Sequence, residues 1–369
     1  MGVKQWIQVW QTCNVDDLEN IDKVTKFLLI SRVCVLPMTL TSAIIGGLLA
    51  FIDGYLNITL FLLVIIGLTL AHMSNNMIND YFDYKHGVDT DEYIRAQYAP
   101  HPILSGLIKP KTFLALIFLV NIPDFLILLY LFLIRGLIVL IFALLGAFFS
   151  FFYVAPPFKF KHRGMGELSV FLVWGPLMIG GTYYVLTGFI SLKTLLLSTP
   201  YGLLVTNVLV GKHVDKYFLD KEKGIKTLPV ILGYEKSKNL VKILSIFTYL
   251  LIIILIISNF LTAWAFIVFI SLPRLVTVWR IFSIDKPENA PIIPKIGGLK
   301  ARIGLLNIDY IFKNESNEGV TWPIWPLWYV AWAFWLNKSI GFLFIVSLIL
   351  EIFYPLDLSS LLKTFTTFF

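Results

Sequence analysis

The chain of 369 residues is 57% hydrophobic and only 14% charged, which is too apolar for an ordinary soluble domain. Its net charge of +7 would suit nucleic-acid binding, but the basic residues stand in short segments between long apolar runs, as in the positive-inside pattern of membrane proteins. We therefore expect an integral, multi-pass membrane protein with membrane lipids around it and no nucleic-acid partner.

Residues 1–27 are more polar than the rest of the chain. They are charged and carry Trp6 and Trp10, so they are too polar for a secretory signal and suit a segment lying at the membrane interface. The two cysteines are Cys13, in this segment, and Cys34, in the next apolar run. Because one is expected in water and the other in apolar surroundings, we predict two free thiols rather than a disulfide or a metal site.

Long apolar runs occupy most of the remaining chain, and each has about the 20 residues that cross a bilayer. They predict an all-α fold of about nine transmembrane helices. The runs lie near 28–51, 57–82, 113–133, 136–155, 166–190, 194–214, 239–258, 261–281 and 326–353. The last is rich in tryptophan, so both one long tilted helix and a re-entrant piece with a short span are open.

Composition therefore divides the chain into four expected parts. They are an interfacial segment at 1–27, a transmembrane core at 28–281, a polar cytoplasmic insertion at 282–322, and an aromatic segment with the last helix at 323–369. The basic residues fall in alternate loops, with little beyond Arg135 and Lys193 in the others. With the N-terminus inside, the basic loops are all cytoplasmic.

Two acidic clusters come directly after spans that end at this same expected face. In "NNMINDYFDYKHGVDT" at 75–90, Asn76, Asp80 and Asp83 stand at i, i+4 and i+7 and share one helix face. The second cluster, "GKHVDKYFLDKEKGIKTLPVILG" at 211–233, offers Asp215 and Asp220. Because the clusters lie four spans apart, we expect two four-helix halves plus a ninth helix.

Oxygen-bearing side chains at a helix end are suitable ligands for Mg²⁺, which commonly shares its coordination shell with substrate phosphates. Two facing acidic clusters would hold such ions and a diphosphate between them, and nearby Lys and Arg residues would contact the phosphates. Each acid alone could instead be solvated past a helix end. Ionisable residues at membrane depth nevertheless favour a functional site.

These segments resemble the UbiA superfamily of intramembrane prenyltransferases. The family's motif Asn-Asp-x-x-Asp, preceded by another Asn, appears as "NNMINDYFD" at 75–83, and "HPILSGLI" at 101–108 is similar to a family loop. The dihydroxynaphthoate (menaquinone-pathway) branch is similar at three places. They are "NDYFDYKHGVDT", "YVAPPFKFKHRGMGELSVFLVWGPLMIGGTYYVLTG" at 153–188 and "KGIKTLPVILG" at 223–233. The resemblance covers roughly residues 28–280.

The second motif departs from the family pattern Asp-x-x-x-Asp-x-x-x-Gly. Four residues separate Asp215 from Asp220, and Lys216 stands where the first Asp would be. Five positions turn a regular helix by about 140°, so the two acids cannot share a face without a bulge or an unwound end. Either Asp215 swings in through such a distortion, or the second metal site is weaker than usual.

The resemblance implies transfer of a polyprenyl group from its diphosphate to an acceptor, with Mg²⁺ stabilising the leaving diphosphate. The implied metal ligands are Asn76, Asp80, Asp83, Asp215 and Asp220, and the four acids are also the catalytic candidates. The candidate diphosphate contacts are Lys85, Arg95, Tyr153, Lys159, Lys161 and Lys226. Each of these basic residues could instead serve only as a positive-inside anchor.

Two alternatives stay open, another acceptor for the same chemistry and a secondary transporter, and a third is disfavoured. The similarity to the dihydroxynaphthoate branch favours an aromatic quinone precursor as acceptor, but other members of the superfamily prenylate a glycerol-phosphate ether lipid, or haem and chlorophyll precursors. A secondary transporter would instead place charges near span centres. An alcohol phosphatidyltransferase would carry Asp-Gly-x-x-Ala-Arg, which is absent from the sequence.

Overall fold

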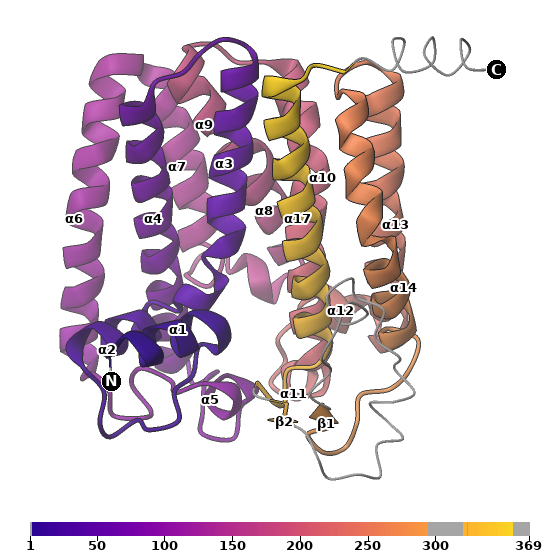
Figure 1. Cartoon of the computed structure of the whole chain (residues 1–369). Coiled ribbons are helices and arrows are strands. Elements are labelled where there is room, and N and C mark those ends of the chain that lie inside the picture. Colours follow the sequence, from indigo (N-terminus) through magenta and orange to yellow (C-terminus); the bar gives the residue numbers. More distant parts are fainter. Residues whose placement is uncertain (1, 294–319, 323, 357–369) are drawn as a thin grey trace.

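The computed structural model describes residues 2–293, 320–322 and 324–356. Long helices run side by side in this part of the chain, and short elements gather at one end of the bundle (Figure 1). Eight helical segments are long and apolar enough to cross a membrane. They are Val33–Ile52 (η1 and α3), Ile58–Lys85 (α4), Pro110–Arg135 (α6), Gly166–Thr187 (α8, η3 and α9), Leu192–Asp215 (α10), Tyr234–Ile257 (α13), Ala263–Ile281 (η4 and α14) and Tyr329–Phe353 (α17).

A ninth apolar helix, α7 (Leu137–Phe151), is shorter and packs against α6 and α9. Together these helices confirm the predicted all-α, multi-pass fold. The tryptophan-rich last run forms one continuous helix, α17, rather than two pieces. The first span begins later than expected, because Arg32 adopts a left-handed backbone conformation (φ 55°) and separates α2 (Lys23–Ile30) from η1 (Val33–Val35).

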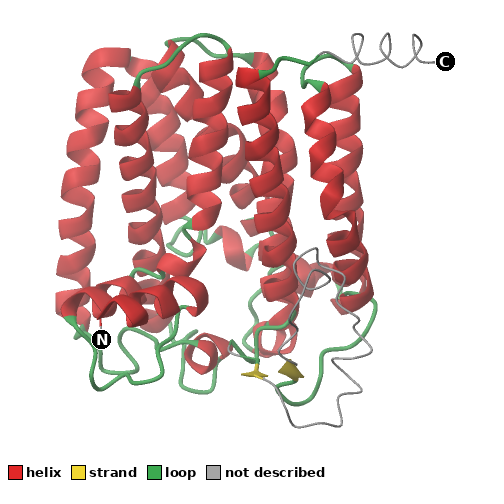
Figure 2. Ribbon diagram, viewed as in Figure 1, coloured by secondary structure: helices red, strands yellow, loops and turns green. Residues whose placement is uncertain are grey.

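Short elements and longer loops collect at the end of the bundle that carries both acidic clusters (Figure 2). They are α1 (Gly2–Thr12), α2, α5 (Ile94–Tyr98), η2 (Phe160–His162), α11 (Tyr217–Glu222) and α12 (Leu228–Leu232). Strands β1 (Ile292–Ile293) and β2 (Val320–Thr321) pair antiparallel there. Most of the predicted insertion at 282–322 lies outside the described residues. That this end is cytoplasmic stays a prediction.

Two local features of the long helices shape the site. Between α8 (Gly166–Leu172) and α9 (Met178–Thr187), η3 (Val173–Leu177) is a π-helical turn that contains Pro176. Proline has no backbone N–H to donate, so a widened turn is expected there. Helix α10 ends at Asp215, and α11 starts only two residues later. This break lies inside the second acidic motif.

Helix α3 (Pro37–Ile52) crosses α9 at a point where only glycine fits. A Cβ on Gly46 would lie 2.5 Å from the Ile179 carbonyl oxygen and 2.8 Å from Thr182 Cβ. We expect Gly46→Ala to lower the free energy of unfolding by about 1–3 kcal/mol, measured by thermal unfolding in detergent. Gly146→Ala in α7 is the control, since a Cβ there meets no atom within 4 Å. Equal shifts for both variants would contradict the close-crossing explanation.

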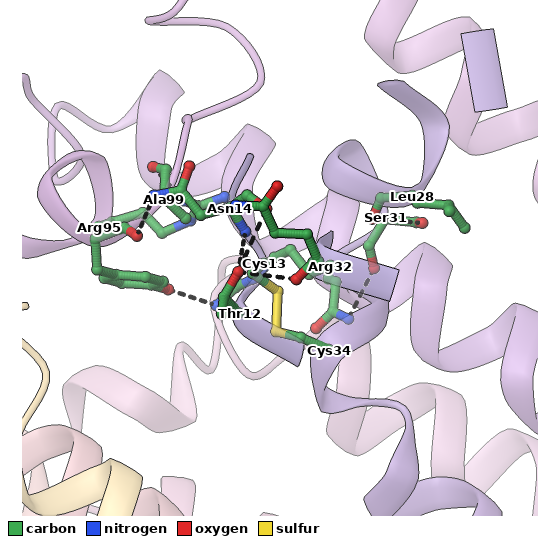
Figure 3. Close-up of a disulfide and its surroundings, with 12 residues drawn as sticks. Thr12, Cys13, Asn14, Leu28, Ser31, Arg32, Cys34, Arg95 and Ala99 are labelled. Atoms are coloured by element: carbon green, nitrogen blue, oxygen red, sulfur yellow. Dashed lines mark hydrogen bonds between the residues drawn. A yellow bond between two sulfur atoms is a disulfide. The ribbon is translucent and has the colours of Figure 1, made fainter. Parts of the chain in front are cut away.

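The prediction of two free thiols is wrong, because Cys13 and Cys34 form a disulfide (Figure 3). Their Cα atoms are 5.3 Å apart, which suits a disulfide bond. Helix α1 folds back on α2 and buries Val9 against Leu29 and Val33. This packing carries Cys13, just past the end of α1, to the start of the first span. The two cysteines therefore lie side by side in one packed cluster, although the sequence predicts Cys13 in water and Cys34 in an apolar span.

Removing this disulfide should destabilise the N-terminal segment. The bond closes a loop between residues 21 positions apart, so we expect Cys13→Ser/Cys34→Ser to lower the free energy of unfolding by about 3 kcal/mol. Thermal unfolding with and without dithiothreitol checks this. The reductant should shift the wild-type protein and leave the double variant unchanged. A wild-type curve insensitive to full reduction would contradict the prediction.

Candidate active site

The first acidic motif places Asp80 between two arginines that come from different elements. Asp80, near the end of α4, is only 1% exposed. Its carboxylate accepts hydrogen bonds from Arg32 Nη1 (3.0 Å) and from Arg95 Nε and Nη2 (3.1 and 2.7 Å). The Arg95 pair is bidentate, which fixes its orientation. Arg32, from the turn before η1, also donates to the Tyr98 hydroxyl at 3.1 Å.

Asp83, one turn further along α4, pairs with a lysine of a distant loop. Lys161 Nζ in η2 donates to Asp83 Oδ2 at 2.7 Å, and both side chains are buried. Burial by itself lowers the pKa of Lys161, but the nearby carboxylates of Asp83, Asp220 and Asp89 outweigh it and raise this pKa. Asp83 Oδ1 is buried and has no hydrogen-bond partner among the described residues. One oxygen of Asp83 is thus available to a ligand.

The second motif contributes Asp220, which is fully buried in α11. Its Oδ1 accepts a short hydrogen bond from the Tyr93 hydroxyl and lies 3.7 Å from Lys216 Nζ, while Oδ2 is buried without a partner in the described chain. Burial raises the pKa of Asp220, but Lys216 leads the opposing effects and the pKa is lowered overall. Lys216 and Lys223 place their ammonium groups 4.5 and 4.8 Å from the centre of the Tyr93 ring. Asp220 is therefore held ionised among cations.

Asp215 lies at the start of α17 in this structure. Its carboxylate oxygens accept hydrogen bonds from the backbone N–H groups of Trp328, Tyr329 and Val330, at 3.0–3.1 Å. These groups open α17, so Asp215 supplies the acceptors and the negative charge that a helix N-terminus requires. The helix does break after Asp215, as an inward swing would need, but the carboxylate faces α17. We therefore leave Asp215 out of the proposed metal site.

Asp89 and His101 extend the cluster. With Asp80 they form a buried group in which one ligand-type atom from each residue lies within 4.8 Å of the others. His101 Nδ1 accepts backbone N–H groups from Ile103 and Leu104, both at 3.2 Å, so Nε2 carries the proton and faces Asp89 Oδ2 at 3.4 Å. Burial raises the pKa of Asp89, yet the neighbouring His101 and the lysines Lys161 and Lys216 lower it overall.

The remaining predicted residues divide by exposure. Asn76 is buried and donates from Nδ2 to the Ser31 carbonyl oxygen at 3.1 Å. The Tyr153 hydroxyl lies 3.4 Å from His213 Nε2, and His213 Nδ1 lies 2.7 Å from Glu167 Oε1. The structure does not bring the other basic candidates into the buried cluster: Lys85 and Lys226 are exposed and Lys159 is half-buried.

Two cavities open beside the cluster. The smaller, of about 200 Å³, is here called the polar cavity. Its polar side chains include Arg32, Asn75, Asn76, Asn79, Tyr98, Tyr153 and Lys212. The larger, of about 580 Å³, is called the apolar cavity and lies between α4, α6, α7 and the η3–α9 segment. Both are lined by His72, Asn75, Ser150, Val173 and Trp174, so they adjoin along a shared wall.

Sequence reasoning did not single out Tyr93, Glu167 or Lys212 as site residues. Tyr93 belongs to a loop without regular spacing, and Glu167 opens α8 with no acidic neighbour in sequence. Lys212 is four positions before Lys216, so a helical projection would have placed both lysines on the same face as possible site residues.

Comparisons with known proteins agree with the geometry. Residues 39–296, well over half of the chain, match the UbiA prenyltransferase family. A 1,4-dihydroxy-2-naphthoate octaprenyltransferase of Bacillus subtilis is 25% identical over 242 residues, covering 64% of this chain and 77% of that protein. One from Haemophilus influenzae is 30% identical over 220 residues, covering 55% of this chain and 68% of that protein.

Solved structures share the fold. An apo UbiA homologue from Aeropyrum pernix K1 superposes with a TM-score of 0.58 at 15% identity, covering 86% of this chain and 97% of that one. A digeranylgeranylglyceryl phosphate synthase gives 0.52 at 18% identity, with 89% and 99% covered. An Archaeoglobus fulgidus homologue bound to GPP and Mg²⁺ gives 0.50 at 14% identity, again with 89% and 99% covered. From the family match, the curated relatives and the membrane-spanning helices together, the chain belongs to the UbiA prenyltransferase family and is an integral membrane prenyltransferase.

Proposed function

We propose that the protein transfers a polyprenyl group from a polyprenyl diphosphate to an aromatic quinone precursor within the membrane and releases diphosphate. One observation carries this proposal: buried carboxylates of both acidic motifs meet buried arginines and lysines next to a polar cavity, and an apolar cavity adjoins the polar one. A charged diphosphate and an isoprenoid tail need these two environments side by side. The aromatic acceptor is supported by the similarity to curated naphthoate octaprenyltransferases.

A divalent metal fits the donor set of the cluster. Asp83 Oδ1, Asp220 Oδ2 and Asn79 Oδ1 are buried oxygens without hydrogen-bond partners in the described residues, and oxygen ligands are those Mg²⁺ prefers. We propose that Asp83 and Asp220 hold Mg²⁺, with Asp80, Asn76 and Asn79 beside them. When bound, the metal would supply charge stabilisation to the leaving diphosphate.

The basic residues of the cluster have their own part in the transfer. In this structure Arg32, Arg95 and Lys161 donate to carboxylates, and the same N–H groups can donate to phosphate oxygens. They would bind the diphosphate and hold it as the bond between its oxygen and the allylic carbon breaks. The new carbon–carbon bond forms to the acceptor ring, which the shared wall of the two cavities would orient, and the attacked ring carbon gives up its proton, which the released diphosphate can accept. The isoprenoid tail would lie in the apolar cavity.

The test uses purified protein with radiolabelled geranylgeranyl diphosphate, Mg²⁺ and a panel of acceptors. The panel contains 1,4-dihydroxy-2-naphthoate, 4-hydroxybenzoate, homogentisate and geranylgeranylglyceryl phosphate. We expect Mg²⁺-dependent transfer to a naphthoate acceptor that is lost in Asp80→Ala and with a chelator. Transfer to the glycerol phosphate alone would replace the aromatic acceptor by a lipid one. Failure to bind the diphosphate at all would contradict the proposed reaction.

A further inference from the structure

Lys212 is a cation that the proposed reaction has not yet used. It lies on α10 one turn before Lys216 and lines the polar cavity. Its ammonium makes no hydrogen bond or ion pair with any residue in 2–293, 320–322 or 324–356, whereas Lys161 and Lys216 each face a carboxylate. A partly buried ammonium without a partner is costly, so a ligand that neutralises it would bind favourably.

The surrounding charge also favours an anion. The charges that act on Lys212 are chiefly the cations Arg32, Lys216 and Lys161, and Asp80 follows as a weaker opposing charge. Asp80 already accepts from Arg32 and Arg95. The part of the polar cavity that Lys212 lines is thus positive, and no carboxylate of the described chain pairs with this lysine.

The other walls of this cavity suit a flat ring. Val205, Leu209 and Lys212 are spaced by four and three residues on α10 and so share one face. Trp174, which also lines the cavity, donates from Nε1 to Thr39 Oγ1 at 3.1 Å and meets the His72 ring edge to face at 5.1 Å. These contacts fix the indole, and a fixed aromatic wall is a common feature of sites that bind aromatic ligands.

The anion that Lys212 would bind is a different one from the diphosphate. Arg32, Asn76 and Asn79 line the polar cavity, but Asp83, Lys161, Lys216 and Asp220 do not. Lys161 and Lys216, the cations beside Asp83 and Asp220, therefore lie next to this cavity, whereas Lys212 lines it. We propose that Lys212 binds the carboxylate of an acidic hydroxy-aromatic acceptor whose ring lies against Trp174. This inference rests on the proposed function and names the chemical group by which that site selects its acceptor.

The experiment compares 1,4-dihydroxy-2-naphthoate with its methyl ester, which has the same ring and no charge. Binding of each to the full-length protein in detergent is measured anaerobically by titration calorimetry, together with binding of geranylgeranyl diphosphate and Mg²⁺. The variants are Lys212→Met and Lys212→Arg. Lys242→Met is the matched control, because Lys242 on α13 donates to Ser283 and lines neither cavity.

We expect the wild-type protein to bind the acid more tightly than the ester by about tenfold to a hundredfold, the range for a hydrogen bond between charged groups. Lys212→Met should bind the acid only as tightly as the ester, with ester and diphosphate affinities unchanged. Lys212→Arg should retain much of the preference for the acid, and Lys242→Met all of it.

Two results would overturn the inference while leaving the proposed function in place. Equal loss of acid and ester affinity in Lys212→Met would show that the residue only shapes the cavity. Loss of diphosphate affinity with an intact preference for the acid would make Lys212 a phosphate contact. If the wild-type protein binds diphosphate but neither aromatic ligand, the aromatic acceptor itself is refuted, and the role of Lys212 with it.

Discussion

Replacing Asp83 with asparagine is expected to lower the rate of prenyl transfer by at least about a hundredfold without unfolding the protein. The substitution keeps the size of the side chain but removes its charge and replaces one of its two oxygens by an amide NH₂. The side chain can then no longer face Lys161 with one carboxylate oxygen and the metal with the other. The loss should fall on kcat more than on KM, because the metal is needed most where charge develops on the departing diphosphate. Single-turnover transfer from radiolabelled geranylgeranyl diphosphate measures it.

A matched control for Asp83 lies at the opposite end of the bundle. Asp53 follows α3 and accepts a hydrogen bond from the Tyr183 hydroxyl at 2.6 Å. Asp53→Asn removes a charge in the same way and should leave the transfer rate within about a factor of three, since exposed substitutions far from a site usually cost little. If Asp83→Asn retains near-normal activity while Asp53→Asn does not, the assignment of the metal site to the first motif fails.

The same substitution should lower the rate of transfer at one acid of the second motif and the stability of the protein at the other. We expect Asp220→Asn to lower kcat by about a hundredfold, because it removes the carboxylate shared by Tyr93 and Lys216. Asp215→Asn should leave kcat within about a factor of three and lower the free energy of unfolding by about 1–2 kcal/mol, because it weakens the start of α17.

Activity and thermal unfolding of both variants, purified in parallel, check this pair of predictions. Dithiothreitol-free buffer keeps the Cys13–Cys34 disulfide intact, so that differences in stability arise from the acids alone. An inactive but fully stable Asp215→Asn protein would return Asp215 to the metal site and contradict the separation of roles. An active Asp220→Asn protein would remove the second motif from the proposed mechanism.

The sequence predicts the spans well because their signal is local. Twenty consecutive apolar residues have few alternatives to a transmembrane helix, and the spacing of Asp80 and Asp83 places them on one face of such a helix. The spacing of Asp215 and Asp220 likewise shows that they cannot share a regular face. In both cases the inference needs only neighbouring residues and helix geometry.

The partners of these acids could not be predicted, because they depend on contacts between distant segments. Asp80 meets Arg32, 48 positions away, and nothing local to either residue specifies the pair. Asp215 meets the backbone N–H group of Tyr329, 114 positions later, and any helix could have supplied a similar donor. The disulfide was missed for the same reason, because only the packing of α1 on α2 brings Cys13 to Cys34.

Helix α17 stands between α3 and α10 and packs against both. Its first turn holds Asp215, and its side chains Val330, Ala331 and Phe334 form one wall of the polar cavity. Membrane proteins are made from the N-terminus onward, so both acidic motifs are synthesised before this wall exists. A partly made chain already inserted in the bilayer would have its carboxylates and lysines in place and no enclosed pocket for an acceptor. The capacity to prenylate is therefore expected to arise in a single late step of biogenesis, when α17 inserts.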